Sequence, residues 1–466
     1  MTHNPLAPSW LTEPDDANAL APGLWPRTAE RESSGELQIG GVPATEIARQ
    51  FGTPVYVIDE REARERADDV RGALQDAFEK IGSHTHVYYA GKALLTSVVA
   101  RWMVDAGCRI DVCSGGELAV ALAAGVEPGD IGFHGNNKSL SEIDRAVGSG
   151  VGTIIIDSIQ EIGRVAEAAA RHGVRQRVRL RVNSGVHAHT HEFLATAHED
   201  QKFGLSLEDA PDAVQRIRHA ESLEFVGLHC HIGSQIFGAG GFAESAARLL
   251  SVHKELLRDG PVPELNLGGG FGIAYTSADA PTPISDLADA IAAIVRDECG
   301  KLQIPVPDMA FEPGRAIIGT AGITLYEAGT TKPVTVETAE GPHTRLYVSV
   351  DGGMSDNART ALYDADYSVR IASRRSASTP ALVRIAGKHC ESGDIVVSDD
   401  YLPSDVKPGD LLAVPATGAY CWSLASNYNY LGRPPIVAVR DGHARVIVRG
   451  ETEADLMARD AGLDGR

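Results

Sequence analysis

The stretch HVYYAGKAL, residues 86–94, joins a short apolar strand directly to a lysine, Lys92. An ammonium group in apolar surroundings is costly unless it is paired or neutral. Lys92 can therefore be a side chain whose stem packs while its charged head reaches water. Alternatively, it is a desolvated amine that attacks a carbonyl and forms a Schiff base. The residues at the other strand ends of the same domain decide between these two interpretations.

Strand-like segments alternate with amphipathic helical segments from residue 60 onward, which is typical of a parallel α/β domain. About eight strand-then-helix units fall within residues 60–320, the number in a closed (β/α)8 TIM-type barrel. The predicted strands are HVYYA from 86, RIDVC from 109, DIGFHG from 130, TIIIDS from 153, RVRLRVNS from 177, LEFVGLHCHIG from 223, ELNLGGGFG from 264 and DMAFEPGR from 308. We interpret residues 185–203 as a long ordered loop.

The segments on either side of residues 60–320 have a different pattern. Residues 321–466 alternate apolar and polar side chains between turns, which predicts a C-terminal antiparallel β-barrel or β-sandwich domain. Residues 35–59 contain short strands that we expect to join this β-domain. Residues 1–34 are rich in Pro, Asp and Ala and predict a poorly ordered N-terminal arm.

Composition excludes several classes of function. The net charge of −20 over 466 residues argues against a nucleic-acid surface. No run of eighteen or so apolar residues occurs, so no membrane span is expected. The N-terminus lacks the basic start and apolar core of a secretory signal. Six cysteines without CxxC spacing fit free thiols in a reducing cytoplasm.

Nearly every predicted barrel strand ends on polar or glycine residues, which packing alone does not explain. Because the chemistry of such barrels lies at the carboxyl ends of the strands, these residues are the candidate site. They are Lys92, Ser114-Gly115-Gly116-Glu117, His134-Gly135-Asn136-Asn137, Asp157, Asn183, His231, Gly268-Gly269-Gly270 and Glu312-Pro313-Gly314-Arg315.

The sequence GGGFG after the seventh strand suits either a tight turn or a phosphate cradle, since glycine lets backbone N–H groups approach an anion. Ser234 could add a hydroxyl donor. His231 is either a hydrogen-bonded strand histidine, as His229 could be, or a flat ring stacked on a flat cofactor. Neither histidine has cysteine partners at zinc spacing, so we expect no metal site. For the HAHTH run at 187–191 we likewise prefer a loop role.

Glu312 in the sequence EPGR ends the eighth strand beside Arg315, and a structural ion pair is one explanation. If a pyridine ring lies here, a carboxylate beside its nitrogen keeps that nitrogen protonated and makes the ring a stronger electron sink.

Nine motifs together resemble the diaminopimelate decarboxylase family, which belongs to the alanine-racemase-like group of pyridoxal-phosphate proteins. They are YYAGKAL, DVCSGGEL, HGNNK, GLHCHIGSQ, LNLGGGFG, EPGRAI, VDGGMSDNARTALYDA, GKHCESGD and GAYCWSLASNYN, in order over roughly residues 50–435. The resemblance implies a barrel with a β-domain and pyridoxal 5'-phosphate as cofactor. It also implies decarboxylation of meso-2,6-diaminopimelate to L-lysine and CO2, the last step of lysine biosynthesis.

The resemblance also implies residue roles. Lys92 would hold the cofactor as a Schiff base, His231 would stack on its ring, and Glu312 would pair with the pyridine nitrogen. The phosphate would be bound by Ser234, Gly269, Gly270, Gly314, Arg315 and Tyr420. The substrate would be bound by Arg315, Arg359, Tyr363, Glu391 and Tyr420. Cys390 would donate the proton after CO2 leaves, and a homodimer would share its active sites.

Three alternatives bear on this assignment. A decarboxylase of another basic amino acid (ornithine, arginine or carboxynorspermidine) has the same fold, but Cys390-Glu391-Ser392 with Arg359 favours diaminopimelate. A racemase usually places an arginine, not a glutamate, by the ring nitrogen. A non-catalytic binding protein would be expected to lose Lys92 or Cys390, and both are present.

Overall fold

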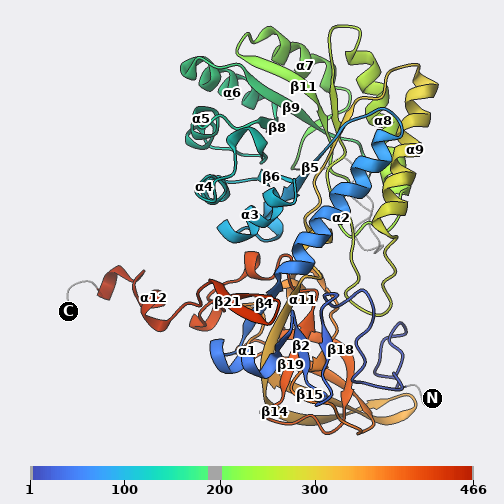
Figure 1. Ribbon diagram of the computed structural model, residues 1–466, viewed down its shortest axis with the longest axis vertical. Coiled ribbons are helices and arrows are strands. Elements are labelled where there is room, and N and C mark those ends of the chain that lie inside the picture. Colours follow the sequence, from blue (N-terminus) through green and yellow to red (C-terminus); the bar gives the residue numbers. More distant parts are fainter. Residues whose placement is uncertain (1–3, 187–201, 464–466) are drawn as a thin grey trace. The chain divides into compact units, whose positions relative to one another are not determined.

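The eight apolar segments between residues 85 and 311 form a closed ring of parallel strands (Figure 1). The computed structural model describes residues 4–186 and 202–463, so the HAHTH run and most of the predicted loop at 185–203 lie outside it. The chain divides into two units. The barrel unit comprises residues 64–272 and 281–317, and the β-unit comprises residues 1–63, 273–280 and 318–466.

Each barrel strand pairs in parallel with its neighbours, and pairing of β9 with both β8 and β11 closes the ring. The strands are β5 (Thr85–Ala90), β6 (Arg109–Val112), β7 (Ile131–Phe133), β8 (Thr153–Ile156), β9 (Gln176–Asn183), β11 (Leu223–His229), β12 (Glu264–Asn266) and β13 (Asp308–Phe311). A short strand, β10 (Leu205–Ser206), adds to β9. The predicted (β/α)8 barrel is confirmed.

Helices connect the barrel strands and surround them (Figure 1). They are α2 (Glu60–Glu79), α3 (Ser97–Asp105), α4 (Gly115–Ala123), α5 (Leu140–Gly148), α6 (Ile159–His172), α7 (Ala210–His219), α8 (Gly240–Leu256), α9 (Ile284–Leu302) and α10 (Arg315–Ile318). Polar strand ends begin some of them: Ser114 caps α4, and Ser139 forms a capping box with Glu142 at α5. Across residues 4–186 and 202–463, no helix has the length and apolarity needed to cross a membrane.

A buried ion pair links the strands inside the barrel. Arg179 on β9 is 1% exposed and its Nη2 donates to Glu264 Oε2 on β12 at 2.6 Å. The guanidinium also lies over the ring of Tyr88 on β5, 5.3 Å from its centroid. Arg177 donates to the other carboxylate oxygen of Glu264 at 2.6 Å. The charges in the barrel interior are therefore paired, as burial requires.

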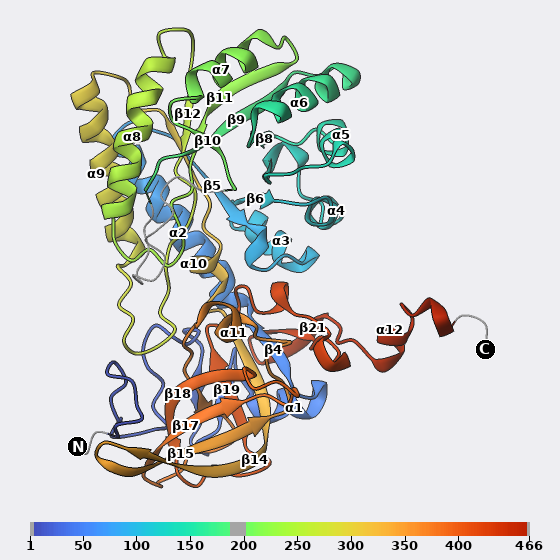
Figure 2. The ribbon, with the colours of Figure 1, turned by 180° about the vertical axis from the view of Figure 1, so that it is seen from behind.

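The β-unit is built on a second sheet, with strand order β18-β17-β15-β14-β4-β20-β21 and with β19 pairing β14 (Figure 2). Its strands are β4 (Val55–Asp59), β14 (Gly322–Thr338), β15 (Gly341–Val350), β16 (Arg370–Ile371), β17 (Pro380–Ala386), β18 (Ile395–Pro403), β19 (Leu411–Pro415), β20 (Ile436–Arg440) and β21 (His443–Val448). Two pairings, β15 with β17 and β4 with β20, are parallel. The other pairings in this sheet are antiparallel, as predicted for the β-domain, and the two parallel ones arise because chain segments from distant positions supply adjacent strands.

Segments before the barrel contribute to the β-unit. β4 pairs with β14 as well as β20, and α1 (Ala44–Phe51) precedes it. A small separate sheet joins β1 (Glu30–Arg31), β2 (Leu37–Ile39) and β3 (Val42–Pro43). The C-terminal segment contains α12 (Glu453–Met457), followed by a 3-10 turn (Ala461–Leu463).

Residues 4–34 are packed, so the expectation of a poorly ordered N-terminal arm is wrong for this segment. Leu24 and Trp25 join the hydrophobic cluster of the β-unit, and Ala7 and Leu11 pack with Leu382 and Tyr401. The prediction used the average composition of the segment, which does not reveal that a few of its apolar side chains pack against the β-unit.

Residues 273–280 also depart from the predicted continuous barrel domain at 60–320, because they belong to the β-unit. Ala274 joins the hydrophobic cluster, and the Tyr275 ring meets the Tyr367 ring edge to face with centroids 5.2 Å apart.

The Arg179–Glu264 pair gives a stability prediction. Replacing Glu264 with Gln leaves the buried Arg179 charge without a counter-ion, and we expect a loss of about 3–5 kcal/mol in the free energy of unfolding. Urea unfolding of the variant measures it. The control is Asp297→Asn, which removes an exposed pair with Arg296 and should change stability by less than about 1 kcal/mol. Equal unfolding midpoints for the two variants would contradict the prediction.

Candidate functional site

Lys92, His231 and Glu312 all follow strands of the barrel unit. Lys92 lies in a single 3-10 turn (Gly91–Ala93) after β5 and is exposed. Its charge is one of the influences that lower the pKa of His231, after burial. The lysine and the histidine therefore face the same end of the barrel.

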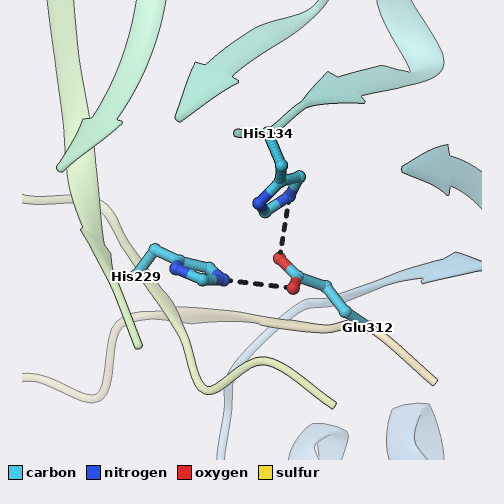
Figure 3. Close-up of side chains that lie close together, drawn as sticks. All are labelled: His134, His229 and Glu312. Carbon is cyan, nitrogen blue, oxygen red and sulfur yellow. Dashed lines mark hydrogen bonds and ion pairs between the residues drawn. The ribbon is translucent and has the colours of Figure 1, made fainter. Parts of the chain in front are cut away.

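The Glu312 carboxylate is held by groups from three other strands. Two of these groups, His229 and His134, are drawn in Figure 3. Asn266 Nδ2, at the end of β12, donates to Oε1 at 2.6 Å, and His229 Nε2, at the end of β11, donates to Oε2 at 3.0 Å. His134 Nε2, just after β7, lies 3.3 Å from Oε1. The side chain of Glu312 is 9% exposed. Contacts to both carboxylate oxygens thus fix the position of the Glu312 side chain.

Burial and charge set the protonation of this cluster. Burial raises the pKa of Glu312, but the neighbouring His229 and His134 outweigh it and hold that pKa well below its usual range. Burial lowers the pKa of His229 to about 4, despite the Glu312 charge. Burial also opposes the charged form of His134, yet Glu312 and Asp111 raise its pKa to about 9. Glu312 is therefore an anion beside a neutral His229 and a cationic His134.

His231 is a neutral ring fixed by the glycine turn. Burial, followed by the charge of Lys92, lowers its pKa to about 3. The Gly269 N–H donates to His231 Nδ1 at 3.2 Å, which sets the orientation of the imidazole. Gly270 has φ +102°, and a Cβ there would stand 2.4 Å from the Gly233 carbonyl oxygen. Only glycine fits this turn.

Ser234, Gly314 and Arg315 lie at the same end of the barrel unit. Arg315 Nη2 donates to Ser234 Oγ at 2.8 Å, and Ser234 is exposed. A Cβ on Gly314 would lie 3.1 Å from the Cβ atoms of Ala90 and Ala93. The EPGR turn therefore packs against the residues on either side of Lys92.

Cys390 and Glu391 lie in the β-unit on an exposed loop that Asp394 anchors. Asp394 Oδ2 accepts from the His389 N–H at 2.7 Å, and Oδ1 accepts from the Met354 N–H at 2.6 Å. The Cys390 N–H donates to Asn429 Oδ1 at 3.1 Å. The loop is thus held at its base while the thiol and carboxylate remain exposed.

Arg359, Tyr363 and Tyr420 belong to the same unit. Arg359 is 6% exposed, its Nη1 donates to the Tyr367 hydroxyl at 2.6 Å, and its guanidinium lies 4.6 Å from the Tyr275 ring centroid. Tyr363, at the end of α11 (Arg359–Tyr363), is 65% exposed. Tyr420 has φ +66°, a conformation that non-glycine residues adopt at a cost.

Sequence reasoning missed Asp111 and Asn266 and noted His134 only as a strand end. Asp111 Oδ1 lies 3.2 Å from His134 Nε2, and Asn266 Oδ1 accepts from the Gly268 N–H at 2.8 Å. Both residues are polar positions within short apolar strands. That placement is a usable signal, because alternate residues of a barrel strand face its interior.

His134, His229 and Glu312 also offer ligand atoms within 4.8 Å of one another, close enough to hold a metal ion. The carboxylate already accepts from His229, and cationic His134 would repel a metal. We interpret the three residues as a proton-bearing network.

Comparisons with known proteins show the family to which this chain is similar. The family model described as pyridoxal-dependent decarboxylase, pyridoxal binding domain, matches residues 67–319. The chain is 50% identical to the diaminopimelate decarboxylase of Mycobacterium bovis over 94% of this chain and 98% of the relative. It is 48% identical to that of Mycobacterium leprae, over 98% and 96%. The crystal structure of the enzyme from M. jannaschii with L-lysine has a TM-score of 0.85 at 34% identity, covering 93% of this chain and 98% of that one.

The depressed pKa of His229 predicts acid sensitivity. In the unfolded chain His229 takes up a proton as the pH falls below about 6.5, whereas in the folded barrel it stays neutral down to about pH 4. Unfolding free energy is therefore lost as the pH falls through this window. His229→Gln keeps a donor for Glu312 without titrating, and should reduce the loss by about 2–3 kcal/mol. Urea unfolding at both ends of the window measures it, with surface His172→Gln as control. A wild-type pH dependence in His229→Gln would contradict the prediction.

Proposed function

The chain belongs to the diaminopimelate decarboxylase family, and we propose on that basis that it converts meso-2,6-diaminopimelate to L-lysine and CO2. The observation that carries the proposal is the anionic Glu312, fixed at the carboxyl ends of the barrel strands on which Lys92 and His231 also lie. The cofactor is pyridoxal 5'-phosphate. When bound, it would act as the electron sink that accepts the electron pair left on the substrate when CO2 departs.

The residues present fit this cofactor. Lys92 offers an exposed amine for covalent attachment, and Glu312 is an anion that can hold a proton at a ring nitrogen. His231 presents a neutral flat ring, suited to stacking. The glycine turn at 268–270 excludes side chains, so backbone N–H groups can reach a phosphate.

We assign the phosphate to the turn and to its neighbours. The Gly269 N–H already donates to His231, so the N–H of Gly270 is the better donor within that turn. The Ser234 hydroxyl and Arg315 are hydrogen-bonded to each other and add a donor and a positive charge. Gly314 and Tyr420 complete the proposed set.

The substrate carries a second amino-acid end, and residues of the β-unit suit it. Arg359 is held rigid by Tyr367 and Tyr275, which lowers the entropy lost when it grips a distal carboxylate. Glu391 can accept from the distal ammonium, and Arg315, Tyr363 and Tyr420 are the remaining substrate contacts in the proposal. Ornithine and arginine lack that distal carboxylate, so a decarboxylase of another basic amino acid is not favoured.

Cys390 is the proposed proton donor. A thiol carries its proton at neutral pH and transfers it readily to a carbanion. Cys390 is exposed on an anchored loop, so it can meet a group outside its own unit. After CO2 departs, the Cys390 Sγ–H would protonate the carbon that lost it.

We further propose a homodimer with shared active sites. Tyr428 and Tyr430, which flank the Asn429 that holds Cys390, are 41% and 74% exposed. Exposed aromatic side chains of this kind are enriched at protein interfaces. Cys390 and Glu391 would then meet the barrel of a second copy. The six free cysteines support a cytoplasmic location for this dimer.

Lys92 provides the test of the activity. The wild-type protein should release CO2 from meso-2,6-diaminopimelate and not from ornithine, arginine or lysine. Lys92→Ala should abolish release, together with the visible absorbance that borohydride removes from the wild type, because the proposed attachment point of the cofactor is gone. Lys80→Ala, an exposed lysine paired with Asp289, is the matched control. Normal turnover in Lys92→Ala would refute the assignment.

Mixing variants tests the shared site. Inactive Lys92→Ala and Cys390→Ala proteins are dissociated together and reassembled. Random pairing makes about half of the dimers mixed, each with one intact site, so about a quarter of wild-type activity should return. Mixing Lys92→Ala with Glu312→Ala is the control, since both changes lie in the barrel and no intact site can form. If the first mixture also stays inactive, each site is built from a single chain.

A further inference from the structure

We propose that His134 is a positioning residue that, as a cation held between Asp111 and Glu312, keeps Glu312 ionised and fixed in place. The inference deepens the proposed function and rests on it, because Glu312 is the residue assigned to the cofactor nitrogen.

The geometry places one imidazole nitrogen against two carboxylates. His134 Nε2 lies 3.2 Å from Asp111 Oδ1 and 3.3 Å from Glu312 Oε1. The three side chains are 12%, 9% and 9% exposed. His134 points at Glu312 from β7, while His229 reaches the other carboxylate oxygen from β11 (Figure 3). His134 Nε2 therefore lies within ion-pair distance of two carboxylate oxygens.

The site for the second carboxylate is built by a glycine. A Cβ on Gly132 of β7 would stand 2.4 Å from Asp111 Oδ1 and 3.4 Å from the Tyr88 ring. No side chain fits at that position while Asp111 keeps this orientation. The strand beside Asp111 thus leaves room for the carboxylate to face His134.

Two buried carboxylates facing one cation are electrostatically coupled. Burial, then the Glu312 charge, raises the pKa of Asp111 to about 6. With His134 charged, both carboxylates can stay ionised near neutral pH. Without that charge, one of the two would take up a proton, since like charges this close cannot both ionise cheaply. Asp111 has the higher pKa and would take up that proton first, and the pKa of Glu312 would rise because the cation facing it is gone.

The other titratable or charged groups around this cluster do not replace His134. They are His229, His231, Arg179, Arg181, Lys92 and Cys113, whose thiol carries no positive charge. His229 and His231 are neutral near pH 7 because burial lowers their pKa values to about 4 and about 3. Arg179 is committed to Glu264, and the Arg181 guanidinium lies 4.2 Å from the Phe203 ring centroid. Lys92 is the proposed cofactor-binding amine.

The first experiment measures the pH profile of the holoenzyme. His134→Gln keeps a side-chain donor but carries no charge. We expect its acidic limb of kcat to move up by about one pH unit, since a charge this close shifts a carboxyl pKa by about 1–3 units. At pH values well below the shifted limb, kcat should then be about tenfold lower than in the wild type, while KM changes less than about threefold. His253→Gln, a buried histidine on α8 outside the cluster, should keep the wild-type profile.

A double variant separates charge from shape. Adding Asp111→Asn to His134→Gln removes the competing carboxylate, so the acidic limb should return most of the way to the wild-type position. A merely structural role for His134 predicts the opposite, because a second change in a packed site adds damage. Failure of Asp111→Asn to restore the limb, or an unshifted limb in His134→Gln, would overturn the inference.

A second measurement does not depend on enzymatic turnover, and it does not require a folded His134 variant. Histidine-labelled ¹⁵N NMR of the cofactor-stripped and loaded protein should show His134 with both ring nitrogens protonated at pH 7.5. In Asp111→Asn its pKa should fall by about one unit or more, because one of its two counter-charges is gone. A neutral His134 at pH 7.5 would overturn the proposal. If His134 titrates as expected but no diaminopimelate is decarboxylated, the proposed function fails while the charge placement stands.

Discussion

The burial of the Glu312 carboxylate is the constraint on which the barrel end depends. An isolated anion with so little exposure would be costly, and it would protonate rather than stay charged. Donors arriving on three other strands remove that cost: Asn266 on β12, His229 on β11 and His134 after β7. The closed ring is what makes these donors neighbours, since the strands are far apart in sequence. Glu312 is therefore charged because the barrel closes around it.

The same logic extends through the barrel interior. Arg179 and Glu264 form a second set of paired charges on β9 and β12, with Arg177 on the other carboxylate oxygen. Since β12 carries both Glu264 and Asn266, one short strand serves both sets. A slip of this strand by one residue would turn both side chains to the outer face. Stability and the candidate chemistry consequently share the register of β12.

Much of this arrangement could be predicted from sequence, for physical reasons. Short apolar strands alternating with helices are a local pattern, and parallel barrels collect their strand ends on one face. This reasoning predicts that Lys92, His231 and Glu312 follow barrel strands at that face. The pairing of His134 with Asp111 could not be found, because it depends on how distant strands are aligned. The packing of Leu24 and Trp25 was hidden for a different reason, since a polar, proline-rich composition says little about two apolar residues within it.

Gly132 constrains how this sequence can change over time. Because a Cβ there would collide with the Asp111 carboxylate, substitutions at the two positions have a required order. Asp111 can be shortened while Gly132 is kept, but a side chain at 132 becomes tolerable only after Asp111 has changed. A substitution of Asp111 must therefore come before a substitution of Gly132. Once residue 132 carries a side chain, an aspartate can no longer return at position 111 in the same orientation. The missing Cβ at position 132 therefore determines the order in which residues 111 and 132 can be substituted.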